Sequence, residues 1–252
     1  EQALAHGAGG LLLVRRFYSP WQRESPATAN VTDTLPVAII SEDTWQALVT
    51  MAGLTTYQAN TAPPATLLPL AAELRVPHSA VRSAPAPTIV GKLAGSDPTA
   101  PALVLAANYD GSGNLPDGTW YPSANRNAAG VAVLLEVARV LRATGQQPRS
   151  TVYLVAWGAE QAGLASSRAL ADSPIAPVTQ TLGVLNLDTV GASDGYYLTL
   201  AGTDAHEGPL LSSLLLAGDL LSRRVTSGRT ELNSLGTDEV LRGLGYPTVQ
   251  LF

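Results

Sequence analysis

Cysteine is absent from the 252-residue chain. This excludes disulfide bonds, thiolate catalysis and zinc–thiolate sites. Uncharged apolar runs all stop short of the roughly 18 residues that would predict a membrane span. Lys92 is the single lysine, and the formal net charge is −5. The sequence therefore lacks the basic surface that nucleic acid or an anionic membrane face requires, and we expect neither a nucleic-acid partner nor a membrane span.

Histidine is scarce as well, with His6, His78 and His206 lying far apart in the sequence. The chain contains no H-E-x-x-H motif, which argues against a zincin, and its three scattered histidines offer no recognisable partner for a nucleophilic serine, which argues against a serine hydrolase. The chain begins at Glu1 without an initiator methionine or a signal-like segment. We expect further chain on the N-terminal side, and any targeting segment would lie there.

Apolar residues make up 46% of the sequence and are grouped into regular segments over residues 88–252. Apolar runs at 102–107, 151–158 and 182–187 predict buried strands. Around them we expect further strands at 88–95, 196–202 and 247–252. We expect helices at 128–143, 207–224 and 237–244. This alternation predicts an α/β domain with a mostly parallel sheet flanked by helices.

Residues 1–87 differ in composition and predict a separate, smaller domain followed by a linker. Strands are expected at 11–18 and 35–41. Ser41, followed by two acidic residues, predicts the start of a helix over 42–52. The Ala-, Thr- and Pro-rich stretch from Thr55 to Pro87 predicts extended chain.

Polar side chains stand where the predicted buried strands end. Because parallel strands place their carboxyl ends at one edge of a sheet, ligand sites gather there. Each residue alone could be an ordinary turn or cap residue, but together they predict a site at this edge. The candidates are Asn108, Asp110, Asn125, Arg126, Asn127, Glu160, Gln161, Asp188, Asp238 and Glu239.

These segments resemble the di-zinc aminopeptidase family, which includes bacterial leucyl aminopeptidases, glutamate carboxypeptidase and the non-catalytic nicastrin-like branch. The resemblance rests on ALVLAANYD, SANRNAAG, LVAWGAEQAGLASS, LNLDTVG and GTDEVLRGLGYP, in the family's order. Residues 1–60 resemble the protease-associated domain that is often inserted in this family, without the start of that domain. The resemblance thus predicts a partial protease-associated domain over 1–87 and a peptidase-like domain over 88–252, incomplete at its C-terminus.

The resemblance also implies roles for individual positions. In the family, two zinc ions are held by a histidine at position 108, a bridging aspartate at 126, a glutamate at 161, an aspartate at 188 and a histidine at 239. This chain has Asn108, Arg126, Gln161, Asp188 and Glu239 there. Glu160 stands at the position of the family's general base. Asp110, Asn125, Asn127 and Asp238 would surround the ligands.

Four of the five ligand positions are therefore substituted. Arg126 is the most damaging change, because its guanidinium stays protonated and offers no lone pair. At about 4 Å and an effective dielectric near 20, two unit charges interact by roughly 4 kcal/mol, and each zinc carries two charges. We therefore expect no cofactor and a catalytically inactive domain in which Glu160 is a vestigial base. We also expect the Arg126 guanidinium to take the place of the metals and to pair with Asp188, Glu160 or Glu239.

The favoured interpretation is a pseudo-peptidase that binds a peptide or a protein partner. The alternative is a residual metal-dependent hydrolase whose site is rebuilt around Asp110, Glu160, Asp188 and Glu239. These oxygen ligands would suit one calcium or magnesium ion better than zinc. The family resemblance alone favours an extracytoplasmic or secreted location.

Overall fold

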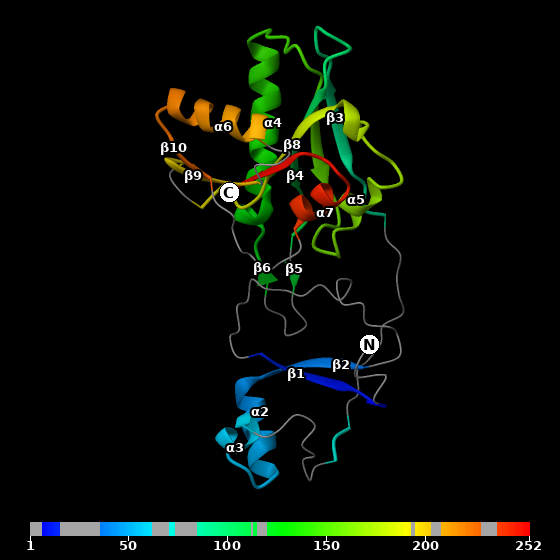
Figure 1. The fold of residues 1–252 in the computed structure, drawn as a ribbon, viewed down its shortest axis with the longest axis vertical. Helices are drawn as coiled ribbons and strands as arrows, with labels where there is room; N and C mark the ends of the chain where they lie inside the picture. Colours follow the sequence, from blue (N-terminus) through cyan, green and yellow to red (C-terminus); the bar gives the residue numbers. More distant parts are fainter. Residues whose placement is uncertain are drawn as a thin grey trace. The chain divides into compact units, whose positions relative to one another are not determined.

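The computed structural model describes residues 7–15, 36–61, 71–73, 85–111, 113–114, 120–192, 195–202, 208–227 and 236–252. The chain divides into two compact units, Glu1–Ser83 and Ala84–Phe252. Each unit has its own sheet (Figure 1). The sequence EQALAHGAGG predicts a helix end over residues 1–10, of which residues 1–6 lie outside the described residues and residues 7–10 are not helical. The assignment of the first unit to a protease-associated domain stays a prediction.

The first unit contains two parallel strands, β1 (Leu11–Arg15) and β2 (Val37–Ser41), which pair with Leu11 opposite Val37. Helix α2 (Glu42–Met51) follows β2 directly. The Ser41 hydroxyl accepts a hydrogen bond from the Thr44 N–H at 3.1 Å. This N-cap satisfies one of the free N–H groups at the helix start, as the sequence predicted.

A second helix in this unit, α3 (Thr56–Thr61), corrects the expectation of extended chain from Thr55 onward. Thr55 and Gln58 form a reciprocal capping box. The Gln58 N–H donates to the Thr55 hydroxyl at 3.2 Å, and the Thr55 N–H donates to the Gln58 side-chain oxygen at 2.8 Å. The T-x-x-Q pattern is the sequence signal that outweighs the weak apolar periodicity of this stretch.

The second unit is organised around a seven-stranded sheet with the order β10-β9-β11-β8-β4-β7-β3. Four of its neighbouring strand pairs are parallel, and the pairs β3–β7 and β9–β11 are antiparallel. This confirms the predicted α/β class with a mostly parallel sheet. The strands are β3 (Ile89–Leu93), β4 (Ala102–Asn108), β7 (Val152–Trp157), β8 (Thr181–Leu187), β9 (Tyr197–Ala201), β10 (Arg224–Ser227) and β11 (Thr248–Leu251).

Helices cover both faces of this sheet because its central strands are apolar on both sides (Figure 1). Along β4, Val104 and Ala106 join one buried cluster, and Ala107 joins the other. The first cluster lies under α5 (Ala165–Ala169) and α7 (Thr237–Gly243). The second lies under α4 (Ala129–Ala143) and α6 (Gly208–Leu220). No helix within the described residues is long and apolar enough to cross a membrane.

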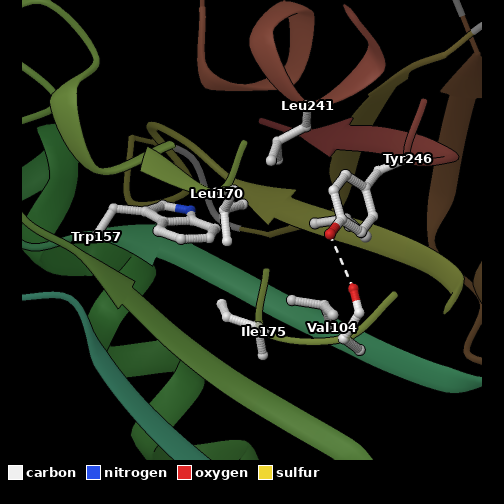
Figure 2. Close-up of a pocket in the computed structure, with 8 residues that line it drawn as sticks. Val104, Trp157, Leu170, Ile175, Leu241 and Tyr246 are labelled. Carbon is white, nitrogen blue, oxygen red and sulfur yellow. Dashed lines mark hydrogen bonds between the residues drawn. The ribbon is translucent and has the colours of Figure 1, made fainter. Parts of the chain in front are cut away.

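The cluster under α7 encloses a small apolar cavity, whose lining is shown in Figure 2. Trp157 from β7 and Leu241 from α7 face it, and both are almost fully buried. Tyr246 closes one side and donates its hydroxyl to the Ala176 carbonyl at 2.8 Å. The polar end of Tyr246 is thus satisfied, and Trp157 belongs to the packed core.

The helix expected over 207–224 ends earlier, because α6 stops at Leu220 and a further strand, β10, begins at Arg224. Ser222 has a left-handed backbone with φ of 54°. The Arg223 N–H donates to the Gly218 carbonyl, and the Ser222 N–H donates to the Asp219 carbonyl. This is a Schellman motif that ends the helix, and it is built on serine, so the glycine that usually marks such a helix end is missing from the sequence.

The loop expected after β4 also contains two short paired strands, β5 (Gly113–Asn114) and β6 (Trp120–Tyr121). A single turn, η1 (Ala124–Ala128), then leads into α4. These elements bring the SANRNAAG segment to the carboxyl ends of the central strands, beside β4 and β8.

We expect Leu241→Ala to lower the free energy of unfolding by about 3 kcal/mol, because it enlarges a cavity in a packed core. Urea denaturation followed by tryptophan fluorescence would measure this, since Trp157 reports on the same cluster. Leu220→Ala is the matched control, because Leu220 is 78% exposed. Equal losses for the two variants would contradict the position of the core.

Candidate functional site

The predicted site residues do gather at the carboxyl edge of the central sheet. Strands β4, β7 and β8 are parallel neighbours, with β4 in the middle. Asn108 ends β4, Glu160 follows β7, and Asp188 follows β8. Arg126 lies in η1 and Glu239 in the first turn of α7. Hydrogen bonds join several of these residues, although they do so in two separate groups.

Asn127 is the centre of the first group and is fully buried. Its amide nitrogen donates to the Leu187 carbonyl at 2.6 Å and to the Asn108 side-chain oxygen at 3.1 Å. Its amide oxygen accepts from the Gly130 N–H at 3.2 Å and the Thr189 N–H at 3.3 Å. One side chain therefore joins the end of β8, the end of β4 and the start of α4.

Glycine is required at 130 by this arrangement. A Cβ atom there would lie 2.7 Å from the Asn127 amide and 3.0 Å from the Cβ of Ala107. Asn125 makes a second contact to the chain after β8, because its side-chain oxygen accepts a hydrogen bond from the Gly191 N–H at 2.7 Å. Both asparagines of the SANRNAAG segment thus hold the backbone after β8.

Asn108 continues this group toward Asp110 and Gln161. Its amide nitrogen donates to the Asp110 carbonyl at 3.0 Å and to one Asp110 carboxylate oxygen at 3.1 Å. The other Asp110 carboxylate oxygen accepts from the Gln161 backbone N–H at 2.7 Å. The carboxylate is therefore occupied on both oxygens, and it ties β4 to the turn after β7.

Glu160 is the centre of the second group and is 5% exposed. One carboxylate oxygen accepts from the Ser167 N–H at 2.9 Å. The other accepts from the Ser167 hydroxyl at 2.9 Å and from the Thr237 hydroxyl at 2.6 Å. Burial raises the pKa of Glu160 above its ordinary value, although these hydrogen bonds act in the opposite direction. The carboxylate fastens the starts of α5 and α7 to the end of β7.

Asp188 contrasts with Glu160. One of its carboxylate oxygens is buried without a hydrogen-bond partner. Burial raises the pKa of this carboxyl, the positive charge of Arg126 lowers it, and the negative charge of Asp238 raises it. Asp188 is therefore a partly buried site carboxylate that no side-chain hydrogen bond or ion pair engages within the described part of the chain.

Arg126 does not form the ion pair expected for it. Its side chain is exposed, and no hydrogen bond or ion pair joins it to Asp188, Glu160 or Glu239 among the described residues. Glu160 needs no cation because hydroxyl and backbone donors already satisfy it. The positive charge of Arg126 lowers the pKa of Asp188, but the ion pair expected from the sequence is not formed among the described residues.

The two acidic residues of α7 take different roles. Asp238 is buried and pairs with Arg242 one turn later in the helix. Arg242 also donates to the Thr248 carbonyl at 3.2 Å, which links α7 to β11. Glu239 is exposed and makes no side-chain bond to the described residues, so the structure does not bring it into either hydrogen-bonded group.

With the site geometry established, residues 88–223 match the peptidase family M28. The chain belongs to peptidase family M28. It is 36% identical over 111 residues to a probable zinc metalloprotease of Pyrenophora tritici-repentis, covering 42% of this chain and 22% of that protein. A probable zinc metalloprotease of Leptosphaeria maculans is 34% identical over 111 residues, covering 42% and 25%. This M28 chain thus spans about a quarter or less of the length of these relatives.

Solved structures agree with this assignment at the level of the fold. An aminopeptidase from Aneurinibacillus sp. strain AM-1 superimposes with a TM-score of 0.70 and 19% identity, covering 99% of this chain and 56% of that one. A zinc aminopeptidase from Bacillus subtilis has a TM-score of 0.54 and 22% identity, covering 66% and 39%. The resemblance to zinc aminopeptidases expected from the motifs is thereby confirmed.

These comparisons correct the expectation that no cofactor is involved. The relatives are named as zinc metalloproteases, and the structural neighbours include zinc aminopeptidases, so the cofactor indicated for an M28 domain is zinc. The expectation of no cofactor rested on the substituted side chains alone, whereas membership of family M28 indicates zinc.

The side chains present do not fit a pair of zinc ions held in the family's manner. Zinc prefers imidazole, thiolate and carboxylate ligands, whereas Asn108 and Gln161 carry amides at two positions that the motif resemblance assigns to ligands. Asp110 and Glu160 use both carboxylate oxygens in hydrogen bonds. Within the described residues, no group of three or more histidine, aspartate or glutamate side chains is placed to hold one ion.

Sequence reasoning placed Asn127 beside the ligands but missed its central position in the hydrogen-bond network. It also missed Ser167 and Thr237, the partners of Glu160. The signal for Ser167 lay in the GLASS segment that follows Glu160, and Thr237 directly precedes the retained Asp238. Small hydroxyl residues at helix starts are common, so their role could be recognised only from the three-dimensional contacts.

We expect Asn127→Ala to lower the free energy of unfolding by about 3 kcal/mol or more, because it leaves several buried backbone groups without partners. Chemical denaturation would measure the loss. Asn125→Ala removes one hydrogen bond and should cost about 1 kcal/mol. If the two variants lose the same stability, Asn127 is not the centre of the network.

The raised pKa of Glu160 predicts a pH effect on stability. Its folded-state pKa lies above the unfolded value, so the stabilising contribution is fully present below the unfolded pKa and is lost as pH rises through the folded pKa. Glu160→Gln should remove this decrease. The urea midpoint, measured from pH 4 to pH 8, would show a flatter profile for the variant than for the native chain.

Glu136 supplies the control for this comparison. Its hydrogen bond from Arg139 lowers its pKa, and the pair is exposed. Its contribution is present above the unfolded pKa and is lost as pH falls, so Glu136→Gln should produce a small change of opposite sign. An unchanged profile in Glu160→Gln would show that burial does not shift Glu160.

Proposed function

We propose that residues 84–252 form a non-hydrolytic member of peptidase family M28 that binds a peptide or protein partner at the carboxyl edge of its sheet. The observation that carries this proposal is that Glu160 is buried and that both of its carboxylate oxygens are hydrogen-bonded. A general base must reach the proton that it removes, directly or through one water molecule. Glu160 is buried and accepts hydrogen bonds from Ser167 and Thr237 on both oxygens.

The neighbouring substitutions support the same proposal. Arg126 stands where the family has a bridging carboxylate, and its fixed positive charge disfavours an adjacent pair of divalent ions. Asn108 is engaged by Asp110 and Asn127 rather than facing a vacant ligand position. The fold keeps its ligand-binding edge, whereas the groups that would perform hydrolysis are used in structural contacts.

Exposed aromatic groups near this edge offer contact area for a partner. Trp120 on β6 is 67% exposed, and Tyr109 follows Asn108 and is 39% exposed. Aromatic side chains provide large apolar contacts with few rotatable bonds, and they are frequent at binding surfaces. A peptide lying along the ends of β4 and β8 would have such contacts within the same region.

A metal-dependent hydrolase with a rebuilt site is the second candidate, and the zinc metalloprotease names of the relatives favour it. The two candidates differ in turnover. In the first, the carboxyl edge binds and does not cleave. In the second, a metal recruited near Asp188 would restore hydrolysis, with Glu160 released from its partners.

Aminopeptidase assays on leucyl and other aminoacyl amides, with zinc, calcium or magnesium in excess, test the proposal. We expect no turnover above the enzyme-free rate, because Glu160 is sequestered. The combined variant Asn108→His, Arg126→Asp, Gln161→Glu and Glu239→His should bind more zinc, as measured by elemental analysis. Turnover by the native chain that is lost in Glu160→Gln would overturn the proposal in favour of the hydrolase.

A further inference from the structure

Strand β10 stands at one end of the seven-stranded sheet and pairs with β9 on its inner side. The Arg224 N–H donates to the Tyr196 carbonyl at 2.9 Å, so the backbone polar groups of Arg224 face β9. Because these groups alternate in direction along a strand, those of Val225 and Ser227 face away from the sheet. No described residue bonds them. The outer edge of β10 is therefore a template on which another strand can pair.

Exposed leucine side chains gather beside this edge, in the C-terminal half of α6 and just after it. Leu216 is 60% exposed, Leu220 is 78% exposed and Leu221 is 71% exposed. The outer face of α6 carries exposed serines at 212 and 213, one turn before Leu216, so the apolar surface is confined to the end of the helix that adjoins β10 (Figure 1). Exposed apolar patches of more than a few hundred Å² mark interaction sites, and three adjacent leucines approach that size.

Gly218 brings helix and strand so close that the leucines and the strand edge form one surface. A Cβ atom at 218 would lie 2.2 Å from Cγ2 of Val225. Only residues 221–223 separate the end of α6 from the start of β10. A strand that pairs with β10 would therefore bring its own chain against the leucines as well.

The charges around this surface are of both signs. Asp219, Arg223 and Arg224 are exposed, and none of them forms an ion pair with a described residue. A two-fold interface brings one patch against the same patch of the other subunit, so the patch must be complementary to itself. A surface that carries an anion and two cations meets this condition, because opposite charges can face each other across the axis.

We propose that two copies of this chain associate about a two-fold axis through β10 and the C-terminal end of α6. The two β10 strands run antiparallel. Since outward-facing backbone groups must oppose each other, Val225 pairs with Ser227 of the partner subunit, and Thr226 lies on the axis. The two sheets then continue into each other. This inference is independent of the proposed function, because it concerns a surface outside the candidate site.

Strand β3, at the opposite end of the sheet, is less suited to such pairing. Gly91 and Lys92 lie within it. Lysine on an edge strand opposes the addition of another strand, and glycine weakens a strand. In β10, Arg224 is the charged residue and occupies the first position. Pairing about Thr226 places the two copies of Arg224 at opposite ends of the paired segment, so their charges do not meet.

Sedimentation velocity of the full chain at increasing protein concentration tests the proposal. A standard interface buries roughly 800 Å² on each partner, and a four-residue strand with three leucines forms a small one. We therefore expect a weak, reversible dimer with a dissociation constant in the micromolar range. The measured mass should rise from 26.1 kDa toward twice that value as concentration increases.

Two variants address the two parts of the surface. Ser227→Pro removes an outward N–H and leaves the hydrogen bonds to β9 in place, because proline is tolerated on the free side of an edge strand. Leu216→Gln removes apolar contact area at an exposed helix position, where folding is not at stake. Each should weaken association about tenfold or more. Circular dichroism would verify that both variants fold.

Leu135→Gln is the matched control for Leu216→Gln, because Leu135 is 67% exposed on another helix, α4. Val90→Glu is the control for the β3 edge, since Val90 is 45% exposed there. Both should leave association unchanged. A chain that stays monomeric at every concentration would overturn the inference and leave the surface to a different partner. A dimer that survives both β10 variants, or that is lost in Val90→Glu alone, would overturn it as well.

Discussion

The amide of Asn127 holds together the part of the sheet where the candidate site lies. Its nitrogen bonds the last carbonyl of β8 and the side chain of Asn108, while its oxygen bonds backbone N–H groups of Gly130 and Thr189. A buried amide in this position must satisfy both its donor and its acceptor, since an unpaired group in the interior is costly. The positions of Asn108, Asp110 and Arg126 all depend on this one side chain.

Glu160 and Asp188 differ in how their carboxylates are hydrogen-bonded, and this difference decides which of them is available to a ligand. Both are acidic residues at the ends of buried strands, and burial raises the pKa of both. Glu160 is surrounded by short-range donors from α5 and α7, and it has become part of the framework. Asp188 has no hydrogen-bond or ion-pair partner among the described residues, and the charges of Arg126 and Asp238 act on it through space. Two similar residues at neighbouring strand ends therefore differ in what they can bind.

Much of the fold followed from sequence, because apolar runs such as ALVLAAN and LGVLNL predict buried strands on their own. The residues that converge on the carboxyl edge followed for the same reason. The lack of an ion pair between Arg126 and the described carboxylates did not, since electrostatics alone favoured such a pair, whereas hydroxyl donors already satisfy Glu160. Helix α3 and strand β10 depend on capping contacts of Thr55 and Ser222, which apolar periodicity does not register.

The hydrogen bonds of Glu160 also affect how related sequences should be interpreted. A glutamate at this position joins β7 to the beginnings of two helices, so its loss would disturb packing whether or not a peptide is cleaved. Selection for a folded protein would then retain it without any selection for hydrolysis. The presence of Glu160 is consequently weak evidence of peptidase activity in this chain.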